Sequence, residues 1–160
     1  MTTSASSPAS NTAPGGMCAS IVARLNAVPY WLLAVPMRLA VAMIFWNSAM
    51  TKLSNWDTAL SLFAEEYKVP LLPPEVAAYV AVGIELAAPV LLVLGLLTRA
   101  TSLVLLGMTA VIEIFVYPLA WPTHLQWAAM LLVLLCRGPG KLSLDDLIGR
   151  RLGVPPAVCP

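Results

Sequence analysis

Three ionisable side chains, Arg38, Glu85 and Glu113, lie within long apolar stretches of the sequence. A charge at the depth of the hydrocarbon core is costly, so each is a candidate for a functional role. Arg38 is placed about ten residues, roughly 15 Å, from the inner edge of its stretch, and Glu85 about twelve residues, roughly 18 Å, from the same edge. We therefore expect an intramembrane ion pair between Arg38 and Glu85. The pair would either fix the register of two helices or handle protons or substrate.

A second group of polar and aromatic residues is expected at the outer surface of the same membrane. An acid, an imidazole and aromatic rings at one interface could hold a quinone headgroup, with Glu113 or His124 exchanging its protons. The candidate quinone site contains Lys52, Glu113, Tyr117, Trp121 and His124, of which Glu113 and His124 are the candidate catalytic residues. The alternative is an aromatic belt, with Glu113 extending toward water.

The composition limits the other classes of function. The chain has 160 residues, of which 59% are hydrophobic and 11% charged, whereas an average soluble domain is about 25% charged. An ordinary soluble enzyme and a basic nucleic-acid-binding protein are therefore excluded. The three cysteines form no Cys-x-x-Cys motif, and a single histidine cannot supply the usual ligands of haem or zinc. We expect no metal site and no intrinsic haem or iron–sulfur centre.

The apolar stretches predict an all-α integral membrane protein, a bundle of four helices within residues 27–137. A membrane-spanning helix needs about 20 apolar residues, and the spans are expected at residues 28–50, 76–97, 100–117 and 119–136. With both termini in the cytoplasm, the loops carry six cations inside and two outside: Arg24, Arg99, Arg137, Lys141, Arg150 and Arg151 against Lys52 and Lys68. The positive-inside rule favours this orientation in a bacterial inner membrane.

The segments outside the spans have patterns of their own. Residues 1–26 are expected to be a disordered cytoplasmic segment, because residues 1–16 are rich in Ser, Thr, Ala, Pro and Gly and carry no charged side chain. The first external loop should hold a helix lying at the interface, with Trp56, Leu60, Phe63 and Tyr67 at helical spacing. Residues 138–160 should contain a short cytoplasmic amphipathic helix that begins after an N-cap at Ser143.

The order and spacing of several short motifs resemble the DoxX family of small four-helix membrane proteins. The resemblance covers about residues 36–152 and rests on Arg38, Phe45-Trp46, Lys52-Leu53, Trp56, Tyr67-Lys68-Val69-Pro70, Leu71-Leu72-Pro73-Pro74, Glu85-Leu86, Pro89, Leu94-Gly95-Leu96, Thr98-Arg99, Phe115-Val116-Tyr117-Pro118, Trp121-Pro122-Thr123-His124, Gly138-Pro139-Gly140 and Leu142-Ser143-Leu144-Asp145. The family takes its name from a subunit associated with a quinone-linked archaeal enzyme that oxidises thiosulfate. The resemblance implies a membrane accessory or quinone-facing subunit.

These observations leave three functions open. The first is a membrane subunit accessory to a redox or sulfur/metal-stress complex, binding quinone and, if catalytic, acting as part of a quinone-linked oxidoreductase. The second is a non-enzymatic anchor, or an assembly or export factor for partner proteins or modified peptides. The third is a small-molecule transporter, which four spans would support only in an oligomer. The expected partners are membrane lipid and either other proteins or further copies of the chain, and no nucleic acid.

Overall fold

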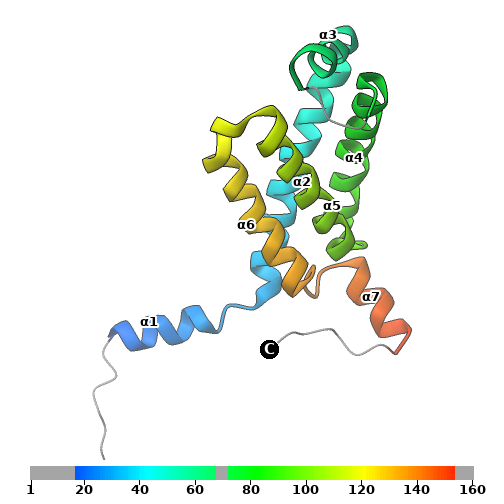
Figure 1. Ribbon diagram of the computed structural model, residues 1–160. Helices are drawn as coiled ribbons and strands as arrows, with labels where there is room; N and C mark the ends of the chain where they lie inside the picture. The colour runs from blue at the N-terminus through cyan, green and yellow to red at the C-terminus, as the bar shows by residue number, and fades with distance from the viewer. Residues whose placement is uncertain (1–16, 68–71, 154–160) are drawn as a thin grey trace, which may run out of the picture.

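The computed structural model describes residues 17–67 and 72–153, and the elements in these ranges are all helical (Figure 1). The longest helices are α2 (Tyr30–Ser54), α4 (Pro74–Leu94), α5 (Thr98–Val111) and α6 (Trp121–Arg137). Shorter elements are α1 (Met17–Asn26), α3 (Trp56–Leu62), α7 (Leu144–Arg151), the π-helical turns η1 (Phe63–Tyr67) and η2 (Ile112–Val116), and the 3-10 turn η3 (Pro118–Ala120).

Four helical segments are long and apolar enough to cross a membrane, which confirms the predicted four-span architecture. They are Tyr30–Ser54, Pro74–Leu94, Thr98–Val116 and Pro118–Arg137. The fourth span reaches a sufficient length because η3 continues into α6. We call the end of the bundle near α1 and α7 the terminal end, and the opposite end, which carries α3, the α3 end (Figure 1).

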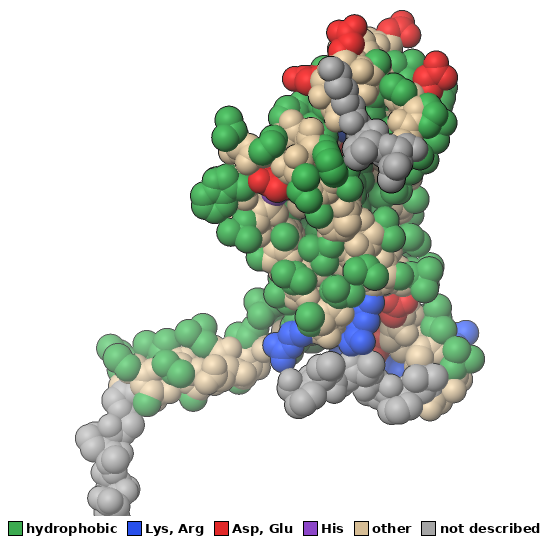
Figure 2. Space-filling view, viewed as in Figure 1, with side chains coloured by type: hydrophobic (Ala, Val, Ile, Leu, Met, Phe, Trp, Pro, Cys, Tyr) green, Lys and Arg blue, Asp and Glu red, His purple; other side chains and the backbone are tan. Residues whose placement is uncertain are grey.

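The spans pack mainly as two pairs, α2 on α4 and α5 on α6. Both helices of the first pair bury small side chains, which allow membrane helices to approach closely; they include Ala42, Ala49, Ala78 and Ala88. Larger buried side chains fill the centre of the bundle: Phe45, Leu92, Leu105, Leu131 and Leu134. Apolar side chains also cover much of the outer surface (Figure 2), as expected for a bundle that contacts lipid.

The expectation of disorder across residues 1–26 is wrong for its last ten residues, which form α1. Met17, Ile21, Val22 and Leu25 recur at helical spacing, and this periodicity favours a helix once the charge-free segment has ended. All four side chains are exposed, and α1 extends sideways from the bundle at the terminal end (Figure 1). Residues 1–16 lie outside the described part of the chain, and so do residues 154–160 of the predicted C-terminal segment.

The helix α7 docks against the turn that joins α4 to α5. Ser143 caps α7 as predicted, its Oγ accepting a hydrogen bond from Asp146 N at 3.2 Å. The carboxylate of Asp145, a residue of α7, accepts hydrogen bonds from the backbone N–H groups of Leu97 (2.8 Å) and Thr98 (3.0 Å). These bonds satisfy backbone N–H groups at the start of α5. The N-cap residue of α5, Leu97, makes no capping hydrogen bond with its own side chain.

Candidate functional site

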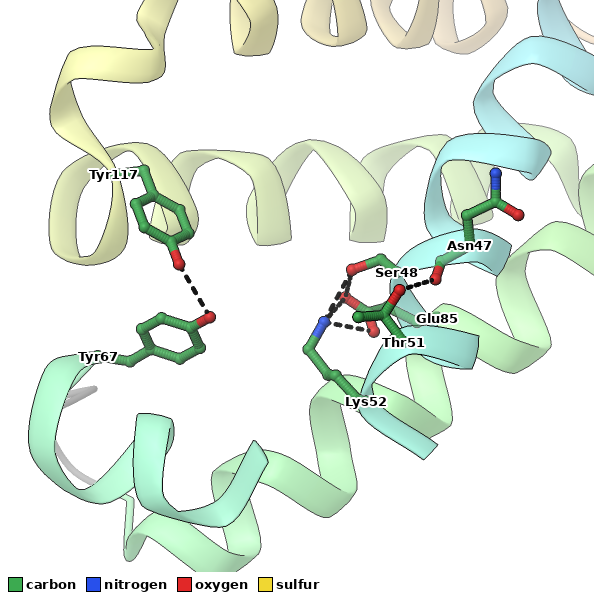
Figure 3. A network of polar contacts seen from close by, with 7 residues as sticks. All are labelled: Asn47, Ser48, Thr51, Lys52, Tyr67, Glu85 and Tyr117. Atoms are coloured by element: carbon green, nitrogen blue, oxygen red, sulfur yellow. Dashed lines mark hydrogen bonds and ion pairs between the residues drawn. The ribbon is translucent and has the colours of Figure 1, made fainter. Parts of the chain in front are cut away.

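The predicted ion pair between Arg38 and Glu85 is wrong, because Glu85 pairs with Lys52. The Lys52 Nζ atom lies 2.8 Å from Glu85 Oε1 and 2.9 Å from Oε2 (Figure 3). Ser48 completes the group: its Oγ accepts from Lys52 Nζ at 2.8 Å and donates to Glu85 Oε1 at 3.0 Å. Glu85 is 1% exposed and Lys52 18% exposed, so the pair is largely removed from solvent.

The direction in which helix side chains lean explains why Glu85 pairs with Lys52 and not with Arg38. Side chains lean toward the N-terminus of their helix, and α2 begins at the terminal end of the bundle. The guanidinium of Arg38 therefore extends toward that end, where Nη2 donates to the carbonyl oxygen of Leu142 at 2.8 Å. Lys52 leans in the same direction from near the other end of α2, which brings its ammonium group to the depth of Glu85. Arg38 itself is 4% exposed, and its Nε and Nη1 have no hydrogen-bond partner among the described residues.

A second ionisable pair joins Glu113 to His124. Glu113 lies in η2 and His124 in the first turn of α6, and the distance from His124 Nδ1 to Glu113 Oε2 is 2.5 Å. His124 is buried, whereas the side chain of Glu113 is 30% exposed. The imidazole packs edge-on against Trp127, with 4.9 Å between ring centroids. The structure thus brings together the two residues that the sequence suggested for proton exchange.

Two tyrosines meet where the π-helical turns end. The hydroxyl oxygens of Tyr67, the last residue of η1, and Tyr117, which follows η2, are 3.2 Å apart (Figure 3). Burial, together with the hydrogen bond to Tyr117, raises the pKa of Tyr67 above its ordinary value. Tyr67 is therefore a neutral phenol at physiological pH, and either hydroxyl can donate to the other. In such a pair one hydroxyl proton is left to hydrogen-bond with a further group.

These groups share a cavity of about 400 Å³ between the helices at the α3 half of the bundle. Lys52, Tyr117 and His124 of the predicted site line it. Glu113 reaches it only through His124, and Trp121, which is 59% exposed, is not among the lining residues.

Six further residues with polar or aromatic side chains line the cavity and were not among the residues predicted for the site: Phe45, Ser48, Phe63, Tyr67, Glu85 and Trp127. Ser48 had a signal, because it lies four residues before Lys52 and so on the same face of the helix. Glu85 was recognised but given the wrong partner. Tyr67 was expected in the interfacial helix, and nothing local indicates that η1 would bring its hydroxyl to that of Tyr117.

The chemistry of the cavity is that of a site for a molecule with a compact polar head. Its walls are otherwise apolar, with Ile44, Ile84 and Met108 among them. Its polar groups are an ion pair with a serine, a phenol pair and a histidine held by a carboxylate. The described residues contain no group of three or more His, Cys, Asp or Glu side chains that could hold a metal ion.

The chain is similar to one known family and to a relative in another bacterium. The family described as DoxX matches residues 33–118, a range that holds Lys52, Glu85, Glu113 and Tyr117 but ends before His124. An uncharacterized protein of Haemophilus influenzae is 32% identical over 127 residues, which cover 70% of this chain and 80% of that protein. No solved structure matches the chain.

Proposed function

Because the chain belongs to the DoxX family of membrane proteins, we propose that it binds a quinone within its bundle as an accessory subunit of a redox or sulfur/metal-stress complex. The orientation proposed with it places both termini in the cytoplasm of a bacterium and the α3 end on the outer side of the inner membrane. The observation that carries the proposal is the cavity, in which polar groups from four different elements face one apolar space.

The size and lining of the cavity suit a quinone ring. Ligand pockets commonly have volumes of about 300–1,000 Å³ and mostly apolar walls with a few placed polar groups. The volume of about 400 Å³ falls in this range. The carbonyl oxygens of a quinone accept hydrogen bonds, and the ammonium of Lys52 and the hydroxyls of Tyr67 and Tyr117 are donors. Trp127 and Phe45, whose rings are in contact, offer an aromatic wall against which the ring would pack.

The histidine pair gives the site a path for protons. With Nδ1 of His124 held by Glu113, the Nε2 atom is the ring nitrogen that can reach a ligand. If Glu113 is ionised, Nδ1 carries the ring proton and Nε2 can accept one from the hydroxyl of a reduced quinone. The partial exposure of Glu113 would allow that pair to exchange protons with its surroundings. Electron transfer itself is assigned to a partner protein.

Quinone binding to the purified protein in lipid nanodiscs tests the proposal. We expect saturable binding of decylubiquinone, measured by calorimetry and by quenching of tryptophan fluorescence, because Trp127 lines the cavity. The substitution Tyr117→Phe should weaken the affinity for decylubiquinone, and His124→Asn the affinity for its reduced form decylubiquinol, whose hydroxyl can donate to Nε2. Each loss should be about 3- to 10-fold, the effect of losing one hydrogen bond.

The control is Trp121→Phe, which changes an exposed aromatic side chain at the same end of the bundle and should leave the affinity unchanged. An absence of saturable binding in the unsubstituted protein would refute the proposal. Equal binding by the double variant Tyr117→Phe, His124→Asn would refute this placement of the quinone.

A pull-down in mild detergent separates the accessory role from that of an assembly or export factor. The accessory role predicts that a redox enzyme is captured with the protein, and the other role predicts peptide-maturation proteins.

A further inference from the structure

The cavity has an incomplete wall between α4 and α5. These two helices are joined at the terminal end by the turn through Gly95, but α4 packs mainly on α2, and α5 mainly on α6. At the α3 end the hydrogen bond between Tyr67 and Tyr117 bridges η1 and η2. Between the turn and this bridge, α4 and α5 pack on each other less than on their main partners.

Three residues on the two sides of this gap both line the cavity and face the exterior. Val80 of α4 is 48% exposed, and Val104 and Val111 of α5 are 49% and 38% exposed. A side chain that borders a cavity and the outer surface marks a place where the cavity opens. The cavity therefore opens along the α4 and α5 side of the bundle, and also near the α3 end, where the lining residues Leu72 and Tyr117 are 44% and 45% exposed.

The depth of this opening places it in the hydrocarbon core. Val80 lies six residues beyond Pro74, the first residue of its span, and Val104 six residues beyond Thr98. At 1.5 Å per residue, each valine is about 9 Å inside its end of the bundle. The exterior that the opening meets is then lipid and not water.

We propose that the cavity is loaded sideways from the membrane through this opening, and that its ligand carries a hydrocarbon chain that stays between α4 and α5. The inference rests on the proposed function and specifies the class of ligand: a chain-bearing amphiphile whose polar head reaches Lys52 and His124, as opposed to a chain-free molecule arriving from water. The valines supply the apolar contact for the chain. The tyrosine bridge covers the head on the side of the α3 end.

Two ligands with the same head separate this inference from the proposed function. The chain-free dimethoxy-methyl benzoquinone tests whether the head is bound, and decylubiquinone tests the contribution of the chain. After correction for partitioning into the nanodisc, we expect the chain to strengthen binding by at least about tenfold, because it is buried against apolar side chains.

Substitutions at the opening should change the rate at which the chain-bearing ligand enters. Val80→Trp and Val104→Trp should slow the association of decylubiquinone by at least about tenfold, because they narrow its entry. Val80→Ala with Val104→Ala should do the reverse and speed both association and release. The matched controls are Val93→Trp and Leu103→Trp, which alter exposed side chains of the same two helices that do not line the cavity.

The outcomes are distinct. If neither ligand binds, the proposed function fails. If the chain-free head binds as tightly as decylubiquinone, or if the tryptophan variants at the opening behave like their controls, the cavity is not loaded between α4 and α5. Unchanged circular dichroism and gel-filtration profiles show that the variants are folded. If a tryptophan variant does not fold, the Val80→Ala, Val104→Ala variant tests the opening in its place, because it should speed association and release.

Discussion

Single side chains decide the polar chemistry of this bundle, and their reach matters as much as their position in the sequence. The side chain of Lys52 has a flexible stem of four methylene groups that leans toward the N-terminus of α2. Its ammonium group therefore lies deeper in the bundle than its own backbone. The same property takes the charge of Arg38 toward the terminal end. The ion pair at membrane depth is consequently Lys52 with Glu85, supported by Ser48.

The pairing of Lys52 with Glu85 predicts strong coupling between their substitutions. Lys52→Met leaves the carboxylate of Glu85 buried without its cation, and such a change commonly costs about 3–5 kcal/mol of unfolding free energy. The double variant Lys52→Met, Glu85→Leu should recover most of this loss. The measurement is the unfolding free energy in a double-mutant cycle in detergent micelles.

The matching cycle with Arg38→Met and Glu85→Leu is the control. We expect these two effects to add to within about 0.5 kcal/mol, because the residues share no contact. Additive losses for Lys52 and Glu85, or strong coupling between Arg38 and Glu85, would contradict the assignment.

Gly95 predicts a local steric effect. Its φ of +65° is one that residues with side chains rarely adopt, and an added Cβ would collide with Arg38 Nη1 and approach Ser143. Gly95→Ala should lower the unfolding free energy by more than about 1 kcal/mol. Gly83→Ala and Gly107→Ala, at helical positions where nothing lies within 4 Å of the new Cβ, should be neutral or stabilising. A Gly95→Ala protein with unchanged thermal stability would show that the turn relaxes freely.

At the scale of elements, capping and turn chemistry place α7 and α5. Pro74 begins α4, where its missing N–H leaves no bond unmade, and Gly95 in the left-handed conformation ends it. The start of α5 has no capping side chain of its own and uses Asp145 from α7, almost fifty residues further along the chain. The backbone N–H of Asp145 also donates to the carbonyl oxygen of Gly95 at 3.0 Å, so α7 is held by side chain and backbone together.

This shared cap predicts that Asp145→Ala will release α7. Losing an N-terminal cap costs about 1–2 kcal/mol, and here the loss also removes the contact between α7 and the spans. Hydrogen–deuterium exchange of the peptide containing Leu144–Arg151 should accelerate. The control is Asp146→Ala, which removes an ion pair with the exposed Arg150 and should alter exchange little. If the two variants exchange alike, Asp145 does not hold the helix.

For the whole molecule, the distribution of charge separates the two ends of the bundle. Basic side chains gather at the terminal end, beside a few acidic ones, and further acidic side chains lie around α3, with a mainly apolar belt between the two ends (Figure 2). The acidic residues at the α3 end include Asp57, Glu65, Glu66 and Glu75. This asymmetry underlies the proposed orientation, because loops rich in Lys and Arg remain in the cytoplasm.

Cysteine labelling tests the orientation. In a background with Cys18, Cys136 and Cys159 replaced by Ser, Ser61→Cys in α3 and Arg151→Cys in α7 each introduce one thiol at an exposed position. A maleimide that does not cross the inner membrane should label Ser61→Cys in intact cells with a permeabilised outer membrane, and Arg151→Cys only after lysis. The reverse pattern would place the termini outside.

The sequence alone determined the membrane environment, the number and approximate bounds of the spans, the helix around Trp56 and the N-cap at Ser143. These features follow from local periodicity, helix length and capping chemistry, which do not depend on distant contacts. It also selected Lys52, Glu113, Tyr117 and His124, because ionisable and aromatic groups stand out in an apolar chain.

Only the tertiary structure decided which of those residues meet. The partner of Glu85 depends on the direction in which Lys52 and Arg38 lean, and the position of Tyr67 depends on the π-helical turn that ends at it. Helix pairing then determines where a cavity remains, because α4 packs on α2 and α5 on α6. Such choices are made by side-chain packing between segments far apart in the chain, and hydrophobic periodicity contains no information about them.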